Sequence, residues 1–206
     1  MRYPAGHKQS THERILAAGG ALLRSAGVEG ASVGRVMSRA GLTVGGFYAH
    51  FASKRALVGE ALRWVLRRKR SDWLRDLEAL RGPAFLEAFV RRYLSRQHRD
   101  LAGQGCPLPA VLSELPRAGA PARRALEAEL ELLCRALEPH AQGESGSLAV
   151  SARQRALATL ALCFGGMALA RAVQDRALSD EILLACRRFA LAPDAARSAS
   201  ERDPLN

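Results

Sequence analysis

Acidic residues are scarce in the first third of this chain. Residues 1–70 contain 13 Lys and Arg against 3 Asp and Glu, whereas residues 71–206 contain 18 against 17. The formal charge of +11 therefore lies almost entirely in the N-terminal part. A basic head on a nearly neutral body is typical of a nucleic-acid-binding protein. A solvated basic surface or a membrane-facing patch would not explain why the excess coincides with the motif described below.

Paired cysteines, long apolar runs and an apolar leader are also missing. The four cysteines (Cys106, Cys134, Cys163 and Cys186) are far apart and form no C-x-x-C pair, which argues against disulfide and metal sites. The longest apolar run, residues 156–170, has 15 residues, fewer than the roughly 20 needed to span a bilayer. The N-terminus has no apolar h-region. We therefore expect a cytoplasmic protein with no membrane partner, no metal and no cofactor.

Aromatic residues make up only 5% of the chain, while Ala, Leu and Arg abound, which favours helices over strands. We predict an all-α fold of about nine helices, with an N-terminal three-helix head that contains a helix-turn-helix and a C-terminal helical bundle that dimerises. Ser10 and Glu13 have the spacing of a capping box, which predicts that the first helix begins there. Outside the helix-turn-helix, the predicted helices span about 10–27, 53–80, 83–99, 110–115, 122–137, 151–176 and 179–191.

Residues 32–51 have the pattern of a helix-turn-helix. Ser32 is a good N-cap for a first helix, and Thr43 can cap a second one over residues 44–51. The apolar residues of the second helix recur at helical spacing: Val44, Phe47 and Phe51. In such a motif the second helix can lie in the major groove of DNA.

The second helix contains two adjacent glycines, Gly45 and Gly46. Each glycine inside a helix costs about 1 kcal/mol relative to alanine, so the pair needs a reason. A bare backbone that must approach a DNA groove closely is one reason. The alternative is an ordinary helical hairpin with the glycines at a close helix crossing. The polar side chains expected to face outward can all donate to phosphate oxygens: Thr43, Tyr48, His50 and Lys54.

The run AGLTVGGFYAHFASKRALVGEAL, which starts at Ala40, resembles the DNA-binding segment of the tetracycline-repressor (TetR/AcrR) family of bacterial transcriptional regulators. The resemblance extends back through RILAAGGALLRSAGVEGASVGRV and covers about residues 10–65. Its most specific part is Tyr48-x-His50-Phe51-x-x-Lys54. Many members carry a bulkier residue at Gly45 or Gly46, so the resemblance specifies phosphate contacts better than base contacts. We predict these DNA-binding residues: Ser32, Arg35, Thr43, Val44, Gly45, Gly46, Tyr48, His50 and Lys54.

The resemblance also implies how the chain is divided. We expect a DNA-binding domain at 8–68, a ligand-sensing and dimerisation domain at 69–192, and a disordered tail at 193–206. The family implies a pocket for a small-molecule effector among the middle helices. Few charges fall on the inner faces of these helices, which favours an apolar or neutral effector. The candidate lining residues are Trp64, Phe85, Phe89, Tyr93, Cys106, Leu108 and Phe164.

The predicted helix over 151–176 is apolar nearly all round, so it must be covered on every side. A second subunit would cover one side, and the alternative is a monomer in which this helix is fully internal. A two-fold dimer reads two half-sites about 34 Å apart or a multiple of this, which implies a palindromic operator in double-stranded DNA. The resemblance implies a four-helix bundle at the dimer interface. The candidate interface residues are Leu160, Phe164, Gly165, Met167 and Leu183.

We therefore expect a ligand-responsive, dimeric DNA-binding repressor that a small effector releases from its operator. An all-helical enzyme is a second possibility, but the sequence shows no paired acid and base, zinc-ligand spacing, phosphate loop or nucleophile elbow. A third is a helical protein-binding adaptor that does not bind DNA.

Overall fold

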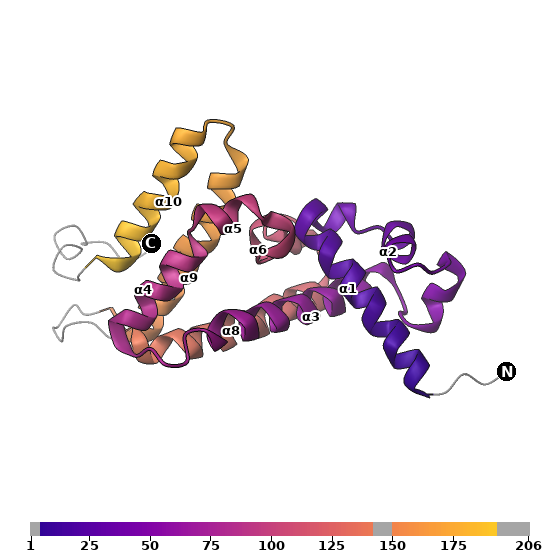
Figure 1. The fold of residues 1–206 in the computed structure, drawn as a ribbon. Coiled ribbons are helices and arrows are strands. Elements are labelled where there is room, and N and C mark those ends of the chain that lie inside the picture. The colour runs from indigo at the N-terminus through magenta and orange to yellow at the C-terminus, as the bar shows by residue number, and fades with distance from the viewer. Residues whose placement is uncertain (1–4, 142–149, 193–206) are drawn as a thin grey trace. The chain divides into compact units, whose positions relative to one another are not determined.

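A computed structural model describes residues 5–141 and 150–192 of the protein (Figure 1). Within these ranges the chain forms ten α-helices, three short 3-10 helices and no strand. The predicted all-α class is thus confirmed. The tail at 193–206, predicted to be disordered, lies outside the described residues.

The chain forms two compact units, and each is built from two separate stretches. The N-terminal unit consists of Met1–Leu74 and Leu101–Glu131, and the C-terminal unit of Arg75–Asp100 and Leu132–Asn206. These units follow from packing within the chain. The division into functional domains at residue 68 stays a prediction.

Helix α1, Ala5–Gly30, begins earlier than predicted. Ser10 and Glu13 both lie inside it, so the capping box predicted at Ser10 is wrong: no residue between Ala5 and Ser10 stops a helix. The predicted end at Gly27 does coincide with a break, since this residue has a left-handed φ of 67° that favours glycine. One further turn follows before the chain enters the next helix.

The rest of the first stretch comprises α2 (Val33–Arg39), the 3-10 helix η1 (Val44–Ala49) and α3 (Lys54–Arg75). Helix α3 ends about one turn before the predicted residue 80. Helices α1 and α3 cross closely, because a Cβ atom built on Gly19 would lie 3.0 Å from Cβ of Ala61. The small residues at this crossing let the two backbones approach and bring the helix-turn-helix against α1.

The second stretch of the N-terminal unit holds η2 (Ala102–Gln104), α6 (Leu108–Val111), α7 (Leu115–Ala118) and most of α8 (Ala120–Leu137). The single helix predicted over 110–115 is wrong, because two short helices form there. The carboxylate of Glu114 accepts hydrogen bonds from the backbone N–H groups of Val28 at 3.0 Å and Glu29 at 2.9 Å. This carboxylate therefore joins the second stretch to the end of α1.

The C-terminal unit contains α4 (Gly82–Tyr93), α5 (Arg96–Asp100), η3 (Glu138–His140), α9 (Ala152–Ala172) and α10 (Arg176–Leu191). The helix predicted over 83–99 divides at Leu94, where the backbone leaves the helical region, and Ser95 Oγ then accepts from the N–H of His98. Helix α9 begins with a capping box of Ser151 and Gln154. Helices α4, α9 and α10 pack together (Figure 1).

Helix α9 has 21 residues and is long and apolar enough, by length and composition alone, to cross a membrane. Half of its most apolar stretch is buried inside the protein, and the core helix of a soluble protein meets the same criteria. The polar side chains of Arg155 and Thr159 are among its buried residues. These features are those of a packed core helix with one exposed face.

Candidate nucleic-acid interface

The first helix and turn of the motif form as the sequence predicts. Ser32 Oγ accepts a hydrogen bond from the Arg35 N–H at 3.3 Å and so caps α2. After α2, Gly41 has a φ of 67°, and the N–H of Leu42 donates to the carbonyl of Met37 at 2.9 Å. This is the glycine-dependent helix ending that directs the chain into the second helix at a steep angle.

The second helix is a 3-10 helix of six residues, not an α-helix over 44–51. The glycine pair weakens any helix at this position, and the chain adopts short i to i+3 hydrogen bonds, such as the Gly46 N–H to the Thr43 carbonyl at 3.2 Å. The Thr43 side chain makes no capping bond, so that part of the prediction is wrong. Thr43 is an exposed residue.

Two phenylalanines hold the second helix in place. Phe47 and Phe51 are buried, and their rings stack with centroids 5.6 Å apart. Val44, predicted to share this inner face, is instead 52% exposed. The anchoring face is thus narrower than the helical period predicts: Phe47 and Phe51 form it without Val44.

The outer face of the second helix is open. Thr43, Val44, Gly45 and Gly46 are exposed, and Tyr48 is 76% exposed. A Cβ atom built on Gly45 would meet no atom within 4 Å, and one built on Gly46 would meet only Cε of Met37 at 3.9 Å. The glycines therefore do not lie at a close helix crossing, and neither has a left-handed φ. They leave bare backbone on the surface of the protein.

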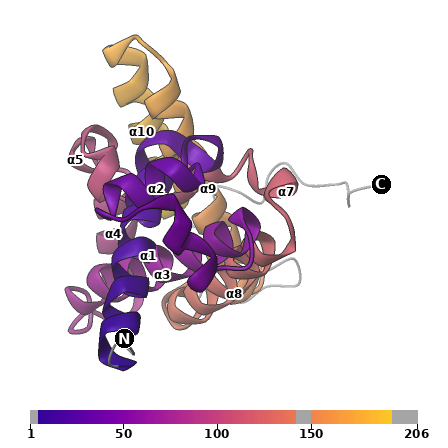
Figure 2. The same ribbon diagram turned by 90° about the vertical axis from the view of Figure 1, so that its right-hand side faces the viewer.

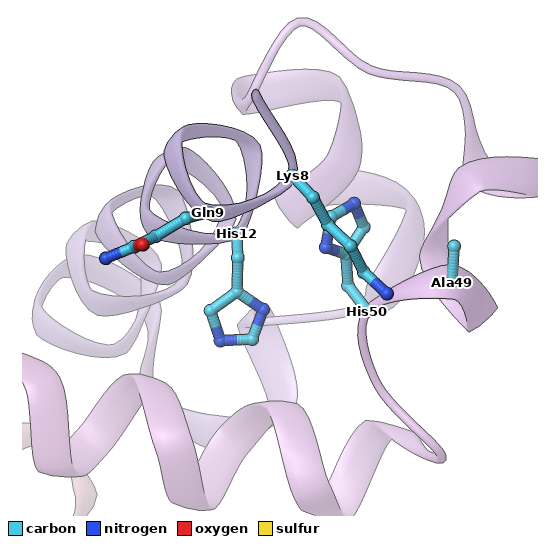
Figure 3. A pocket seen from close by; sticks show the side chains of 5 residues that line it. All are labelled: Lys8, Gln9, His12, Ala49 and His50. Carbon is cyan, nitrogen blue, oxygen red and sulfur yellow. The ribbon is translucent and has the colours of Figure 1, made fainter. Parts of the chain in front are cut away.

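His50 faces outward less than predicted. It lines a hollow of about 380 Å³. The other lining residues are Lys8, Gln9, His12 and Ala49 (Figure 3). The His50 ring lies 5.8 Å from that of His12, and its Nδ1 is buried without a hydrogen-bond partner among the described residues. Burial, together with the nearby His12 and Lys8, lowers the pKa of His50. This shift favours the neutral imidazole, and Nε2 is the ring nitrogen left to contact a ligand.

Basic residues border this face. Lys54 is exposed at the start of α3, where Ser53 Oγ accepts from the Ala56 N–H at 3.1 Å. Arg35 is exposed too, and its guanidinium donates to the Gly30 carbonyl at 2.8 Å. Arg14, which sequence reasoning missed, donates to the carbonyl of Ala40 at 2.7 Å and so fixes α1 to the end of α2. No sequence pattern signals that bond, because an exposed arginine on α1 resembles any solvated charge.

Residues 15–61 match the model of the bacterial regulatory proteins of the tetR family. The N-terminal segment belongs to the tetR family. The predicted resemblance is thus confirmed, and the regulators of this family bind DNA. No curated protein matches the sequence.

Solved structures agree on the fold. A TetR transcriptional regulator from Chloroflexus aurantiacus has 22% identity and a TM-score of 0.73, over 91% of this chain and 97% of that one. A TetR-family regulator from Agrobacterium tumefaciens has 21% identity and a TM-score of 0.70, over 88% and 98%. The reduced form of E. coli NemR has 22% identity and a TM-score of 0.70, over 88% and 95%. About nine-tenths of this chain thus has the fold of tetR-family regulators.

The residues predicted to line an effector pocket fall into two groups. Phe89, Tyr93 and Phe164 come together in the C-terminal unit, with ring centroids 6.2 Å apart for Phe89 and Tyr93 and 5.4 Å apart for Tyr93 and Phe164. Phe85 stacks on His140 at 4.0 Å in the same unit. The other three are in the N-terminal unit: Trp64, half-buried, and Cys106 and Leu108, both buried. The effector pocket stays a prediction.

Most of the residues predicted at the dimer interface are buried within the single chain: Leu160, Phe164, Met167 and Leu183. Gly165 is exposed. Other apolar side chains of the same two helices face outward: Leu157 and Leu169 on α9, and Leu178, Leu184 and Phe189 on α10. On α9 the exposed positions Leu157, Ala161, Gly165 and Leu169 are four residues apart and form one stripe. Periodicity alone did not separate the inner face of α9 from the outer one, and an interface at these helices stays a prediction.

Proposed function

We propose that this protein is a dimeric transcriptional repressor that binds a palindromic operator in double-stranded DNA and leaves it when a small effector binds. The observation that carries the proposal is the exposed face of residues 43–48. There, two glycines offer bare backbone beside Tyr48, while Phe47 is buried and holds the segment. A short helix with its backbone exposed on a basic head suits insertion into a DNA groove.

Each predicted residue takes a role in this interface. Tyr48, Thr43 and Lys54 donate to phosphate oxygens, and His50 adds a contact through Nε2. Gly45 and Gly46 let the backbone approach the base edges, and the exposed side chain of Val44 can contact a thymine methyl group. Ser32 and Arg35, at the start of α2, are the remaining proposed contacts and bind the neighbouring DNA strand. Phosphate contacts fix the position of the protein, and contacts to base edges select the sequence.

The dimer, in this proposal, forms through the exposed stripe of α9 together with the outward residues of α10. An apolar stripe on a two-fold symmetric interface contacts its own copy. Leu157→Glu combined with Leu169→Glu should convert the dimer to a monomer in analytical ultracentrifugation, because four carboxylates would be buried per dimer. A dimer that survives both substitutions would place the interface elsewhere.

The effector, in this proposal, is small and apolar or neutral, since the aromatic cluster of Phe89, Tyr93 and Phe164 is the largest grouping of candidate lining residues. It acts only through different affinities for the DNA-bound and DNA-free states. The protein works in the cytoplasm, where the DNA is accessible.

A salt titration tests the DNA-binding proposal. The affinity of the intact protein for a mixed-sequence duplex, measured by gel shift, should fall steeply as salt rises, because displaced phosphate counterions drive binding. Lys54→Ala should lower the slope of log K against log salt by about 0.9 per subunit. Tyr48→Phe should weaken binding with little change of slope, since it removes a neutral donor. A protein-binding adaptor would show no salt-dependent DNA binding.

Arg67→Ala is the matched control. It removes an exposed charge from the same helix, 13 residues after Lys54, or about 20 Å further along the axis. It should leave the slope almost unchanged. If Lys54→Ala and Arg67→Ala behaved alike, Lys54 would not be a phosphate contact.

A further inference from the structure

A second basic segment lies beside the proposed DNA-binding face. Helices α3 and α8 run side by side and in the same direction (Figures 1 and 2). Gly59 packs against Pro121 near their starts, and the Arg70 guanidinium donates to the Glu129 carboxylate at 2.9 Å further along. The turn between α7 and α8 therefore lies at the same end as the first residues of α3.

The contact between this turn and α3 is direct. A Cβ atom built on Gly119 would lie 3.0 Å from Cδ of Arg55, so the Arg55 side chain covers the turn. Gly119 has a φ of 95°, which favours glycine there on backbone grounds as well. Arg55 follows Lys54 directly in the sequence. The turn therefore contacts the residue directly after Lys54, which is proposed to hold a phosphate.

The turn is strongly basic. Residues 115–124 contain Arg117, Arg123 and Arg124 and no acidic residue. These three arginines and Arg55, which together we call the flank surface, are all exposed. None of the four makes an ion pair within the described part of the chain. The nearest acidic residue along α8 is Glu127, four residues after Arg123, and it forms no ion pair with Arg123.

The direction of the side chains brings these charges closer to Lys54. The Cα–Cβ bonds of a helix tilt toward its N-terminus, so Arg123 and Arg124 lean back toward the end of α8 that adjoins the start of α3. Neither α3 nor α8 has an acidic residue in its first turn. The mutual repulsion of four unpaired cations brings no benefit to the folded chain by itself, whereas a polyanion along this surface would relieve it.

We propose that the flank surface binds the DNA backbone next to the base pairs that the helix-turn-helix reads. The proposal rests on the proposed function, because it extends the same interface. Guanidinium groups bind phosphate oxygens in a bidentate manner, so the surface adds affinity that does not depend on base sequence. A segment far along the chain, residues 115–124, thus takes part in DNA binding alongside residues 32–54.

Two duplexes test this surface with the full chain. One is the shortest core site selected from random sequences by the intact protein, and the other is the same core extended by about one helical turn, 10 base pairs, on each side. The intact protein should bind the extended duplex more tightly. Arg117→Gln with Arg123→Gln should bind the core duplex as the intact protein does but should lose the gain from extension. Its salt slope on the extended duplex should fall by about 1.8 per subunit, or about 0.9 for each contact.

Arg67→Gln with Arg68→Gln is the control, since it removes the same charge from α3 at an exposed site further from Lys54. It should keep both the tighter binding of the extended duplex and the slope of log K against log salt. Ala120→Lys, at an exposed position in the turn, should raise the slope, which no loss of folding can imitate. The inference is overturned if the intact protein gains nothing from extension, if the double variant keeps the gain, or if the control loses as much. If the intact protein binds neither duplex, the proposed function fails with it.

Discussion

Replacement of Gly45 by alanine should stabilise the protein and weaken its binding to DNA. Gly45 lies in η1 with no left-handed φ, and a Cβ atom there would meet nothing within 4 Å. A glycine-to-alanine change at such a position stabilises by about 0.4–1 kcal/mol, mainly because the unfolded chain loses freedom. For a protein of this length, the melting temperature should rise by about 1–4 °C.

The effect on DNA binding should have the opposite sign. If the backbone at Gly45 approaches the base edges closely, the added methyl group holds the two surfaces apart and removes several contacts. We expect at least a tenfold loss of operator affinity, equivalent to about 1.4 kcal/mol. A thermal melt followed by circular dichroism gives the first quantity, and a gel shift on the selected core duplex gives the second.

Gly103→Ala is the matched control for this prediction. Gly103 is also exposed in a 3-10 helix, η2, and a Cβ atom there would also meet nothing within 4 Å. It should give a similar rise in melting temperature with unchanged DNA affinity. If Gly45→Ala were more stable and bound DNA as tightly as the intact protein, the reasoning that the glycine serves close approach to DNA would be refuted.

Three further changes have definite expected results. Gly46→Leu should change the preferred base sequence, measured by selection from random duplexes, because a side chain would then enter the groove; an unchanged preference would remove this residue from the interface. Gly59→Ala should destabilise the protein by about 1–3 kcal/mol in urea unfolding, because its Cβ would lie 2.5 Å from Cβ of Pro121; an unchanged midpoint would contradict the packing of α3 on α8. Burial, with Arg81 nearby, lowers the pKa of His140, whose Nδ1 accepts from the Gly82 N–H at 3.0 Å. The unfolded chain therefore binds the proton first as pH falls through about 6.5, and stability falls with it. His140→Asn should flatten that loss between pH 7.5 and 5.5, and an equally steep loss would show that His140 does not cause it.

The sequence predicted well those features that depend on local chemistry. The capping role of Ser32, the turn at Gly41 and the break at Gly27 each require a particular residue type at one position. The burial of Phe47 and Phe51 follows from their spacing and size. Such features can be predicted because residues close in the sequence determine them.

Features decided by distant contacts could not be read from the sequence. Nothing near Glu114 signals that its carboxylate receives the N–H groups of residues 28 and 29. The start of α1 was misplaced because a capping pattern inside a helix looks the same as one at its end. Likewise, an apolar helix such as α9 carries no local signal of which face its own chain will cover.

The N-terminal unit is discontinuous in sequence, and this limits how it can be isolated or exchanged. A fragment that ends at residue 74 would leave Gly59 and its neighbours on α3 uncovered and would deprive the end of α1 of the Glu114 carboxylate. A chimera that joins only the first 74 residues to the body of a tetR-family regulator would lack residues 101–131 and would depend on what that body supplies in their place. A transfer of the DNA-binding function to another protein should therefore carry both stretches of the N-terminal unit together.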